Sequence, residues 1–405
     1  MTAAAIHDLI VIGAGPAGAS AAAQARALGL SVALVDRARF PRDKLCGGGV
    51  SGRAMGHLGQ VFGDLPTDLF LPLSRVRLKV AGQVIGDHAD LPAIHMTMRR
   101  AFDAALLARA TALGAHTLTG AKLATLDADT GTVTLSDGTS LQGRVILGAD
   151  GVNSAVARHL FGRAYDPATI GFAMEVEAPR RAPTPDDTVE IDLAAADWGY
   201  GWSFPKHGSL TLGVGGIALR NPDIRVDLAH YLTGQGIAPD TLRPKGAFLP
   251  FGDFRRDPGR GRVLLAGDAA GLVDPITGEG IAWAVHSGQI AARIAARVIA
   301  QGNPTAAART YRRALAPVHT ELRRARQLRA LIYSRPLRPH FATMLCAHPG
   351  LQRRYLALLA GQVDYADLGP GSLARMIWRI ASARLRRAAP QDPPSGPPPA
   401  RLDVP

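Results

Sequence analysis

Three glycines near the N-terminus have the spacing that a dinucleotide-binding turn requires. They form the motif Gly13-x-Gly15-x-x-Gly18, which follows an apolar run and opens an alanine-rich helical pattern, and the next apolar run ends at Asp36. This order predicts a strand, a turn, a helix and a second strand. Gly13 allows the tight turn, Gly15 lets a pyrophosphate approach the backbone, and Gly18 lets the helix pack on the strand. Asp36 would accept hydrogen bonds from an adenosine ribose, so the unit predicts a site for NAD, NADP or FAD.

A basic, glycine-rich segment follows at residues 37–51. Its consecutive glycines, which begin at Gly47 and Gly48, suit a backbone that passes close to a flat ligand or adopts positive φ. Lys44 would face a pyrophosphate. Cys46 directly precedes the glycines, and two interpretations stay open for it. It is either a small buried side chain or a thiol that lines a redox site and donates a proton.

Two later strands each end in an acid beside a glycine. The first is Ala149-Asp150-Gly151, and the second ends at Gly267-Asp268. A loop around Pro275 and a long helix from about Gly280 to Ala300 follow the second strand. Asp268 is placed to accept a hydrogen bond from a polyol hydroxyl, and among the three dinucleotides only FAD carries a ribityl chain. These features favour FAD.

Three aromatic residues alternate along one predicted strand, although aromatic residues make up only 5% of the chain. They are Tyr200, Trp202 and Phe204, and a hairpin turn is predicted at Lys206 to Gly208. Because side chains two residues apart point to the same face of a strand, the three rings share one face. That face is either packed on the core or forms an apolar wall for a greasy substrate beside a flavin.

Further patterns predict the elements that position these groups. Apolar residues at helical spacing predict a helix from Met98 to about Gly114, with Arg99 at its start. Residues 132–141 are typical of a hairpin, and residues 165–255 have strand character. Helices are expected from residue 303 onward, among them an amphipathic basic helix over Leu373 to Leu385. The proline-rich tail that follows has the composition of a disordered segment.

Bulk composition limits the class of protein. A chain of 405 residues with 47% hydrophobic residues can form one large domain or two moderate ones. No stretch is long enough for a transmembrane helix, and no signal peptide is apparent. The two cysteines, Cys46 and Cys346, lie far apart, which excludes a disulfide framework and fits a cytoplasmic setting. We expect no metal site.

The formal net charge of +13 has two interpretations. Residues 309–338 contain nine arginines and one acid, Glu321. These arginines form either solvated faces or a surface that docks on anionic lipid headgroups. Because no nucleic-acid motif accompanies the charge, we expect no nucleic-acid partner. From the cysteine usage we expect a cytoplasmic location. If the arginines dock on lipid headgroups, the protein would also associate peripherally with the inner face of the membrane.

Taken together, these segments resemble a known family. The glycine motif with Asp36, the segment 44–49, the strand end at residues 149–151, and Gly267-Asp268 with the loop 275–280 are similar in order and spacing to FAD-dependent oxidoreductases of the para-hydroxybenzoate hydroxylase fold. Two motifs narrow the resemblance to the geranylgeranyl reductase family. They are Phe40-Pro41-Arg42-x-Lys44-x-Cys46-Gly47-Gly48 and Tyr200-Gly201-Trp202-Ser203-Phe204-Pro205. The resemblance covers roughly residues 5–330.

The resemblance implies an α/β flavoprotein of two domains. A Rossmann-type FAD-binding domain carries an inserted antiparallel-sheet substrate domain, and C-terminal helices follow. The implied FAD-binding parts are residues 5–75, 98–165 and 256–302. The implied substrate domain comprises residues 76–97 and 166–255, and residues 303–388 and 389–405 are the helical region and the tail.

The implied activity is the saturation of isolated C=C bonds in a geranylgeranyl or related polyprenyl group. Hydride would come from reduced FAD. The chain shows no second motif for a resident nicotinamide cofactor, because the glycines from Gly213 to Gly216 lie in a strand pattern with no helix after it. NADPH would therefore bind only transiently, or reduced ferredoxin would supply the electrons. An FAD-dependent monooxygenase of the same fold is the alternative. A non-enzymatic flavin electron carrier or lipid-binding protein is a third reading. The sequence leaves the oligomeric state open, and a monomer is compatible with it.

The resemblance also assigns site residues. Arg99 occupies the family's Arg-x-x-Phe-Asp position near the cofactor. The implied cofactor-binding residues are Gly13, Gly15, Pro16, Ala17, Gly18, Asp36, Arg37, Lys44, Cys46, Gly47, Gly48, Arg99, Asp150, Gly267, Asp268, Pro275, Gly278, Gly280 and Ile281. The implied catalytic residues are Cys46 as proton donor and Tyr200, Trp202 and Phe204 as the wall of a prenyl tunnel, whose faces would stabilise positive charge on the substrate.

Overall fold

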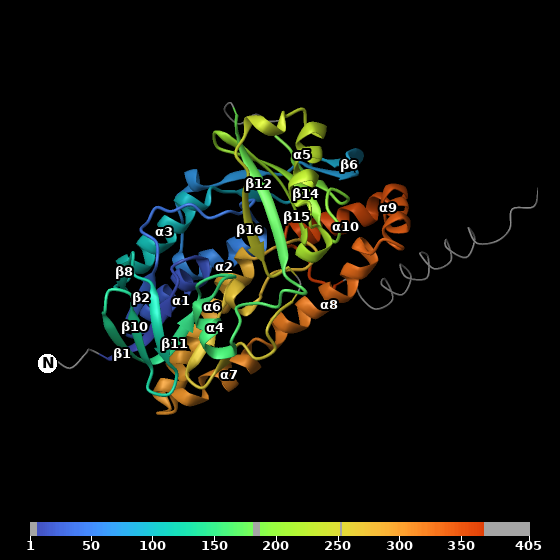
Figure 1. Ribbon diagram of the computed structural model, residues 1–405. Helices are drawn as coiled ribbons and strands as arrows, with labels where there is room; N and C mark the ends of the chain where they lie inside the picture. The colour runs from blue at the N-terminus through green and yellow to red at the C-terminus, as the bar shows by residue number, and fades with distance from the viewer. Residues whose placement is uncertain (1–5, 181–186, 252, 368–405) are drawn as a thin grey trace, which may run out of the picture.

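A computed structural model describes residues 6–180, 187–251 and 253–367, and it places them in two lobes built on two large sheets (Figure 1). The predicted helix 373–385 and the tail lie outside the described residues. The lobe with the N-terminus contains the parallel strands, and the second lobe contains a mostly antiparallel sheet. The chain crosses between the lobes several times, so each sheet contains segments that are far apart in the sequence.

The first sheet has the order β17-β18-β11-β1-β2-β8 within the described part of the chain, with β10 and β9 continuing from β11. The strands β1, β2, β8, β11 and β18 pair in parallel. Their buried sides consist of aliphatic residues, as expected for a parallel sheet covered on both faces. The bounds are β1 (Ile6–Ile12), β2 (Val32–Asp36), β8 (His116–Thr119), β9 (Leu123–Asp127), β10 (Thr132–Leu135), β11 (Ser140–Gly148), β17 (Gly259–Arg260) and β18 (Val263–Leu265).

Small residues let the helices of this lobe approach one another closely. A Cβ added to Gly288 of α6 would overlap the carbonyl of Ala17 in α1, so the two helices are in backbone contact there. Ser287 of α6 donates its hydroxyl to the carbonyl of Ala284. The helices are α1 (Pro16–Ala27), α2 (Gly52–Phe62), α3 (Arg99–Ala112), α4 (Ala155–Phe161), α6 (Ile281–Ala300) and α7 (Ala307–Ala314). The predictions of a helix from Met98, a hairpin at residues 132–141 and a long helix after Gly280 are confirmed.

The second sheet has the order β16-β12-β15-β14-β13-β5-β6 over the residues that are described. The predicted hairpin is present, because β14 and β15 pair as antiparallel neighbours around the turn after Lys206. The bounds are β5 (Val76–Val80), β6 (Gln83–His88), β12 (Gly171–Pro179), β13 (Val189–Asp192), β14 (Tyr200–Lys206), β15 (Ser209–Ile217) and β16 (Lys245–Leu249). One segment differs from expectation: β7 (Ile94–Met96) pairs with β3 (Gly49–Val50) and β4 (Leu71–Leu73) in a separate small sheet.

Helices cover both faces of the second sheet. On one face, Leu228 and Leu232 of α5 (Ile224–Gly234) pack with Leu212 and Val214 of β15. On the other face, the C-terminal helices α8 (Ala316–Tyr333), α9 (Arg338–Ala347) and α10 (Pro349–Leu359) share a core with the sheet. Helix α8 runs from the first lobe toward the second in Figure 1. Short 3₁₀ helices are η1 (Thr67–Leu69), η2 (Ala218–Arg220), η3 (Pro239–Thr241), η4 (Gly267–Ala270) and η5 (Pro304–Ala306).

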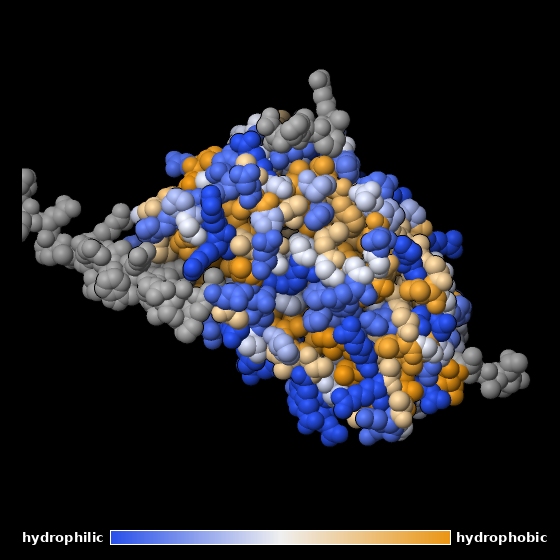
Figure 2. Space-filling view, turned by 180° about the vertical axis from the view of Figure 1, so that it is seen from behind, coloured by the Kyte–Doolittle hydropathy of each residue, from blue (hydrophilic) through white to orange (hydrophobic). Residues whose placement is uncertain are grey.

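Several C-terminal arginines have acidic partners. These ion pairs are Arg312–Asp257 at 2.7 Å, Arg326–Asp253 at 3.4 Å and Arg335–Asp197 at 3.4 Å. In the view from behind, hydrophilic side chains are interspersed with smaller apolar patches (Figure 2). Of the helices in the described ranges, none combines the length and the apolar character that crossing a membrane would require.

Candidate active site

A cavity of about 510 Å³ lies between the two lobes and joins the glycine turn to the aromatic strand. Gly13 and Gly15 line one end, and Tyr200, Trp202 and Phe204 line the other. The aromatic side chains come from β14 of the second sheet, whereas the glycines follow β1 of the first. The tertiary fold therefore brings the two predicted sites together in one continuous space.

The glycine turn has the geometry that its sequence predicted. Gly13 has φ +102°, and a Cβ there would lie 2.5 Å from the carbonyl carbon of Ala149. A Cβ at Gly18 would overlap the carbonyl oxygen of Gly13, so Gly18 serves the packing of α1 and does not line the cavity. A Cβ at Gly15 would meet only the guanidinium of Arg42, at 3.5 Å. The backbone at Gly15 is therefore open toward the cavity.

Asp36 holds the turn as well as facing the cavity. Its Oδ2 accepts a hydrogen bond from the Ala14 N–H at 2.7 Å, and its Oδ1 accepts one from the Ala38 N–H at 2.8 Å. Each carboxylate oxygen retains a second lone pair that a ribose hydroxyl can use. Arg37 lies beside it in the cavity lining. The adjacent helix α1 begins with Pro16 and carries no acidic residue in its first turn, which leaves its N-terminal amides to an anion.

Two arginines and a buried aspartate form the cationic side of the cavity. Arg99 donates two hydrogen bonds to Asp103, at 2.7 and 2.8 Å, and Arg42 lies 3.1 Å from the same carboxylate. Burial by itself would lower the pKa of Arg99, but the charge of Asp103 and the nearby Cys46 outweigh it and raise that pKa above its ordinary value. Two guanidinium groups share one carboxylate, so a net positive charge faces the cavity beside the glycine turn.

The Cys-Gly-Gly segment lies against the aromatic strand. Gly48 has φ +78°, as the sequence predicted for this segment, and its N–H donates to the Cys46 Sγ at 3.4 Å. A Cβ at Gly47 would lie 2.9 Å from the ring of Phe204 and 3.4 Å from Trp202 Nε1. Only a residue without a side chain allows this approach. Lys44, Cys46, Gly47 and Gly48 all line the cavity.

The three rings of β14 are consecutive neighbours. The ring centroids of Tyr200 and Trp202 are 5.9 Å apart, and those of Trp202 and Phe204 are 6.4 Å apart. The Tyr200 hydroxyl donates to the Thr277 carbonyl at 2.7 Å, and burial raises the pKa of Tyr200 above its ordinary value. Trp202 Nε1 is buried and has no hydrogen-bond partner among the described residues. These residues face the cavity, so the aromatic stripe is more than a surface packed on core.

Comparisons with known proteins agree with this arrangement. A family model described as FAD dependent oxidoreductase matches residues 8–97. The chain is 32% identical over 313 residues to a menaquinone reductase of Mycobacterium tuberculosis, covering 71% of this chain and 76% of that protein. It is 31% identical over 313 residues to a geranylgeranyl diphosphate reductase of Rhodobacter capsulatus, covering 74% of this chain and 77% of that protein.

The chain belongs to the geranylgeranyl reductase family of FAD-dependent oxidoreductases. A solved structure of a geranylgeranyl bacteriochlorophyll reductase-like protein from Thermoplasma acidophilum has the same fold, with a TM-score of 0.73 at 19% identity, and covers 87% of this chain and 96% of that one. The expected α/β class of a two-domain flavoprotein is thereby confirmed.

The residues of this flavoenzyme fit the cofactor of its family. The cavity begins at an uncapped helix N-terminus with a bare glycine backbone, which suits a pyrophosphate, and it carries a carboxylate at Asp36 for a ribose. It extends past Asp268 to the aromatic wall, which is the order of groups in an extended FAD. Asp268 makes no side-chain hydrogen bond with the described residues.

The remaining predicted cofactor residues divide into two groups. Pro16, Ala17, Asp150, Gly278, Gly280 and Ile281 line the cavity, whereas Gly267 and Pro275 do not. Gly278 has φ +72°, and a Cβ there would overlap the Tyr200 hydroxyl. Asp150 also has a structural role, because its Oδ2 accepts hydrogen bonds from Ala155 N and Val156 N at the start of α4, at 2.6 and 3.3 Å.

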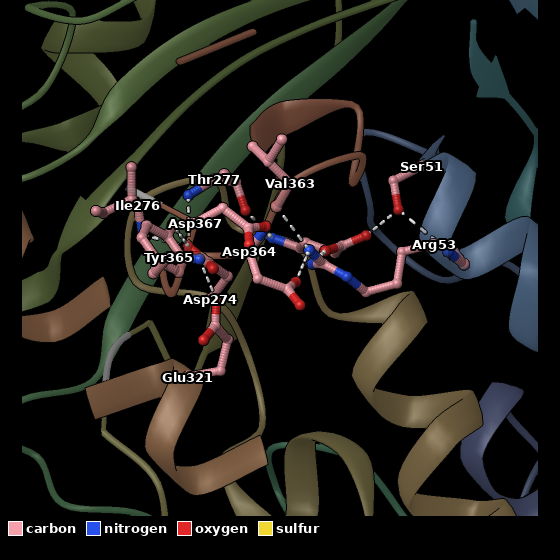
Figure 3. Close-up of polar contacts among 12 residues, drawn as sticks. Ser51, Arg53, Asp274, Ile276, Thr277, Glu321, Val363, Asp364, Tyr365 and Asp367 are labelled. Carbon is pink, nitrogen blue, oxygen red and sulfur yellow. Dashed lines mark hydrogen bonds and ion pairs between the residues drawn. The ribbon is translucent and has the colours of Figure 1, made fainter. Parts of the chain in front are cut away.

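Sequence reasoning missed a polar cluster behind the loop 274–279, part of which lines the cavity. The C-terminal segment 363–367 contacts the loop 274–279 and the start of α2, as Figure 3 shows. Tyr365 donates its hydroxyl to Asp274 Oδ1 at 2.9 Å, and Arg53 bonds both Glu279 at 2.8 Å and Asp364 at 2.6 Å. Ser51 donates to the same Glu279. The only indication of this cluster in the sequence is that the acids at residues 274 and 279 flank a predicted loop.

Glu175 is a second residue that was missed. It lies on β12, lines the cavity and is only 7% exposed. The sequence suggested only a strand with alternating acids at Glu175 and Glu177. Both acids point to the same side of the sheet, and only the tertiary structure shows that Glu175 lines the cavity whereas Glu177 bonds Thr211 farther along the strand.

Proposed function

We propose that this enzyme saturates isolated C=C bonds of a polyprenyl chain by reduction. One observation carries the proposal: the anion-binding glycine turn and the wall of Tyr200, Trp202 and Phe204 border the same cavity. The relatives named above, a menaquinone reductase and a geranylgeranyl diphosphate reductase, support a reductase that acts on such a molecule. The further lining is apolar, from Ile94, Met96, Val189, Ile191, Phe251 and Leu359, and suits a hydrocarbon chain.

The proposed cofactor contacts follow the length of the cavity. Gly13, Gly15 and the start of α1 would hold the pyrophosphate, Arg42 and Arg99 would neutralise it, and Asp36 would hold the ribose. Asp268 would contact the ribityl chain, and the backbone at residues 278–281 would edge the ring system. Reduced FAD supplies a hydride when it is bound at such a site.

The protein's own residues would make the alkene reactive. An isolated trisubstituted alkene accepts a hydride poorly, so protonation must lead or accompany the transfer, and positive charge builds on the tertiary carbon. The ring faces of Tyr200, Trp202 and Phe204 would stabilise that charge by about 0.5–2 kcal/mol each. Enclosure by the second sheet and by Leu359 of helix α10 would keep water from trapping the cation. We propose Cys46, which lines the cavity beside these rings, as the group that delivers the proton.

Electron supply and location complete the proposal. NADPH or reduced ferredoxin would reduce the cofactor transiently. The arginines of residues 309–338 for which the described residues provide no acidic partner would allow a peripheral contact with anionic membrane, where a prenyl substrate resides.

The test is to incubate the reduced enzyme with geranylgeranyl diphosphate and with a prenylated quinone or pigment. Mass spectrometry would detect the addition of one hydrogen pair for each double bond. Absence of hydrogenated product from all of these substrates would reject the proposal. Oxygen consumption coupled to hydroxylation of an apolar substrate would favour the monooxygenase alternative. A flavin that is reduced and reoxidised without any product would favour an electron carrier.

A further inference from the structure

A buried carboxyl group adjoins the thiol of the site. Glu175 Oε1 accepts a hydrogen bond from the Cys46 N–H at 3.0 Å, although the two residues are 129 positions apart. Its Oε2 is buried and has no hydrogen-bond partner in the described part of the chain. Glu175 lines the cavity and is 93% buried. One of its carboxyl oxygens is held by the backbone N–H of Cys46, and the other can carry a proton.

The charges around Glu175 act in opposite directions on the pKa of its carboxyl group, so the group can both hold and release a proton. Burial raises the pKa of Glu175 above its usual value, with a smaller contribution from Glu177, and the ammonium groups of Lys206 and Lys44 oppose this rise. Lys206 is itself only 2% exposed. Lys245 faces Glu175 across the strand pair β12–β16, but its side chain is exposed and lies 4.0 Å from Asp43. The buried acid is therefore set between an apolar cavity and two cations.

The thiol next to it needs a proton after each reaction cycle. Cys46 Sγ accepts the Gly48 N–H and interacts with the Arg99 guanidinium, and both contacts tolerate a negative sulfur. A sulfur that has given up its proton in a water-poor cavity must recover it from a nearby acid. The hydrogen bond from Cys46 N places the Glu175 carboxyl next to the residue that bears this sulfur.

We propose that Glu175 is the proton reservoir of the site. The inference rests on the proposed function. The alkene gains a hydride from the reduced flavin, which is thereby oxidised, and a proton from the Cys46 thiol, which leaves a thiolate. Glu175 then transfers its carboxyl proton to that thiolate, and the resulting carboxylate is stabilised by the Cys46 N–H and Lys206 until solvent protonates it again. Glu175 is thus a positioning residue that acts through Cys46.

The test compares Glu175→Gln with a matched control, Glu177→Gln, which lies on the same strand and bonds Ser209 and Thr211 instead. The glutamine amide oxygen can still accept the Cys46 N–H, so a purely structural role would survive the change. The first readout needs neither substrate nor bound flavin: the pH profile of Cys46 alkylation by iodoacetamide, in a Cys346→Ser background that removes the exposed second thiol. An ionised Glu175 disfavours the thiolate. Glu175→Gln should therefore lower the alkylation midpoint by roughly one pH unit, and Glu177→Gln should leave it in place.

The second readout is turnover with a prenyl substrate. Glu175→Gln should keep FAD binding and lose about 10²-fold in steady-state rate, whereas Glu175→Asp, which retains a carboxyl group, should recover part of that rate. An unchanged alkylation midpoint, or a Glu175→Gln enzyme as fast as wild type, would overturn the relay. If Glu175→Gln fails to fold, Glu175→Asp takes its place. A Cys46 alkylation midpoint that falls in Glu175→Asp by the full amount expected for loss of the carboxyl group would also overturn the relay. Failure of the wild-type enzyme to reduce any prenyl chain would reject the proposed function instead, and the alkylation profile distinguishes the two outcomes.

Discussion

Replacing Arg53 by methionine should destabilise the protein in a way that depends on pH, because Arg53 neutralises a buried acid. Its side chain is 15% exposed and lies 2.8 Å from Glu279, which is 9% exposed. Its second partner, Asp364, is 55% exposed, so that ion pair contributes little. Methionine keeps an apolar stem near the Trp283 ring, over which Arg53 now stacks at 5.0 Å. The expected loss comes mainly from leaving Glu279 without its partner, and removal of one member of a buried pair costs about 3–5 kcal/mol.

The sign of the pH dependence follows from the pKa of Glu279. Burial raises that pKa from 4.5 to about 7, although Arg53 opposes the rise. In the wild type, the unfolded state therefore binds fewer protons than the native state between about pH 4.5 and 7, so stability falls as pH rises through this window and levels off above it. Without Arg53 the native pKa of Glu279 rises further, and the fall continues above pH 7. The additional loss should be about 1.4 kcal/mol for each pH unit by which that pKa increases.

The assay is equilibrium unfolding by urea at a series of pH values on both sides of neutrality, with the free energy of unfolding as the measured quantity. The Arg53→Met loss should be constant in mildly acidic solution and should grow above neutral pH. In a Glu279→Gln background, the same Arg53→Met change should cause a smaller loss that does not vary with pH. A loss of equal size at every pH in both backgrounds would refute the reasoning, because it would show that the guanidinium acts through packing alone.

Three more predictions concern the cavity and its supports. Gly18→Ala should abolish FAD binding, measured by flavin retention and fluorescence titration, because the added Cβ overlaps the Gly13 carbonyl; full flavin content would contradict this geometry. Trp202→Leu should retain FAD but reduce a prenyl substrate more slowly, because the activation free energy should rise by about 0.5–2 kcal/mol. Reoxidation of the reduced flavin by substrate at the wild-type rate, measured by stopped flow, would show that the ring takes no part in the reaction. Tyr365→Phe should lower the free energy of unfolding by about 1–3 kcal/mol, because Asp274 loses a buried donor; an unchanged denaturation midpoint would show that Asp274 finds another partner.

The Cys46 assignment is tested in the same framework. Cys46→Ala should slow alkene reduction while FAD remains bound, because alanine removes the thiol but keeps the backbone N–H that bonds Glu175. Product analysis by mass spectrometry measures the rate, and unchanged turnover would reject the thiol as proton donor.

The sequence by itself determined the features that depend on short spacing. The turn at Gly13 and the close packing at Gly18 follow from local backbone sterics, and the common face of Tyr200, Trp202 and Phe204 follows from the two-residue period of a strand. The cofactor class followed from the order of these local motifs. Such features are legible because neighbours within a few residues fix them.

Only the tertiary structure decided which distant groups meet. The bond between Cys46 and Glu175, the contact of Tyr365 with Asp274, and the pairing of β7 with β3 and β4 in a separate sheet all join segments far apart in the chain. Each depends on strand pairing and helix packing that no local spacing specifies. The face of the sheet to which both Glu175 and Glu177 point is decided by the register of β12 against β15 and β16, because a shift by one residue would turn every side chain of the strand to the opposite face. That Glu175 of these two acids lines the cavity is decided by the packing of the Cys46 segment against it.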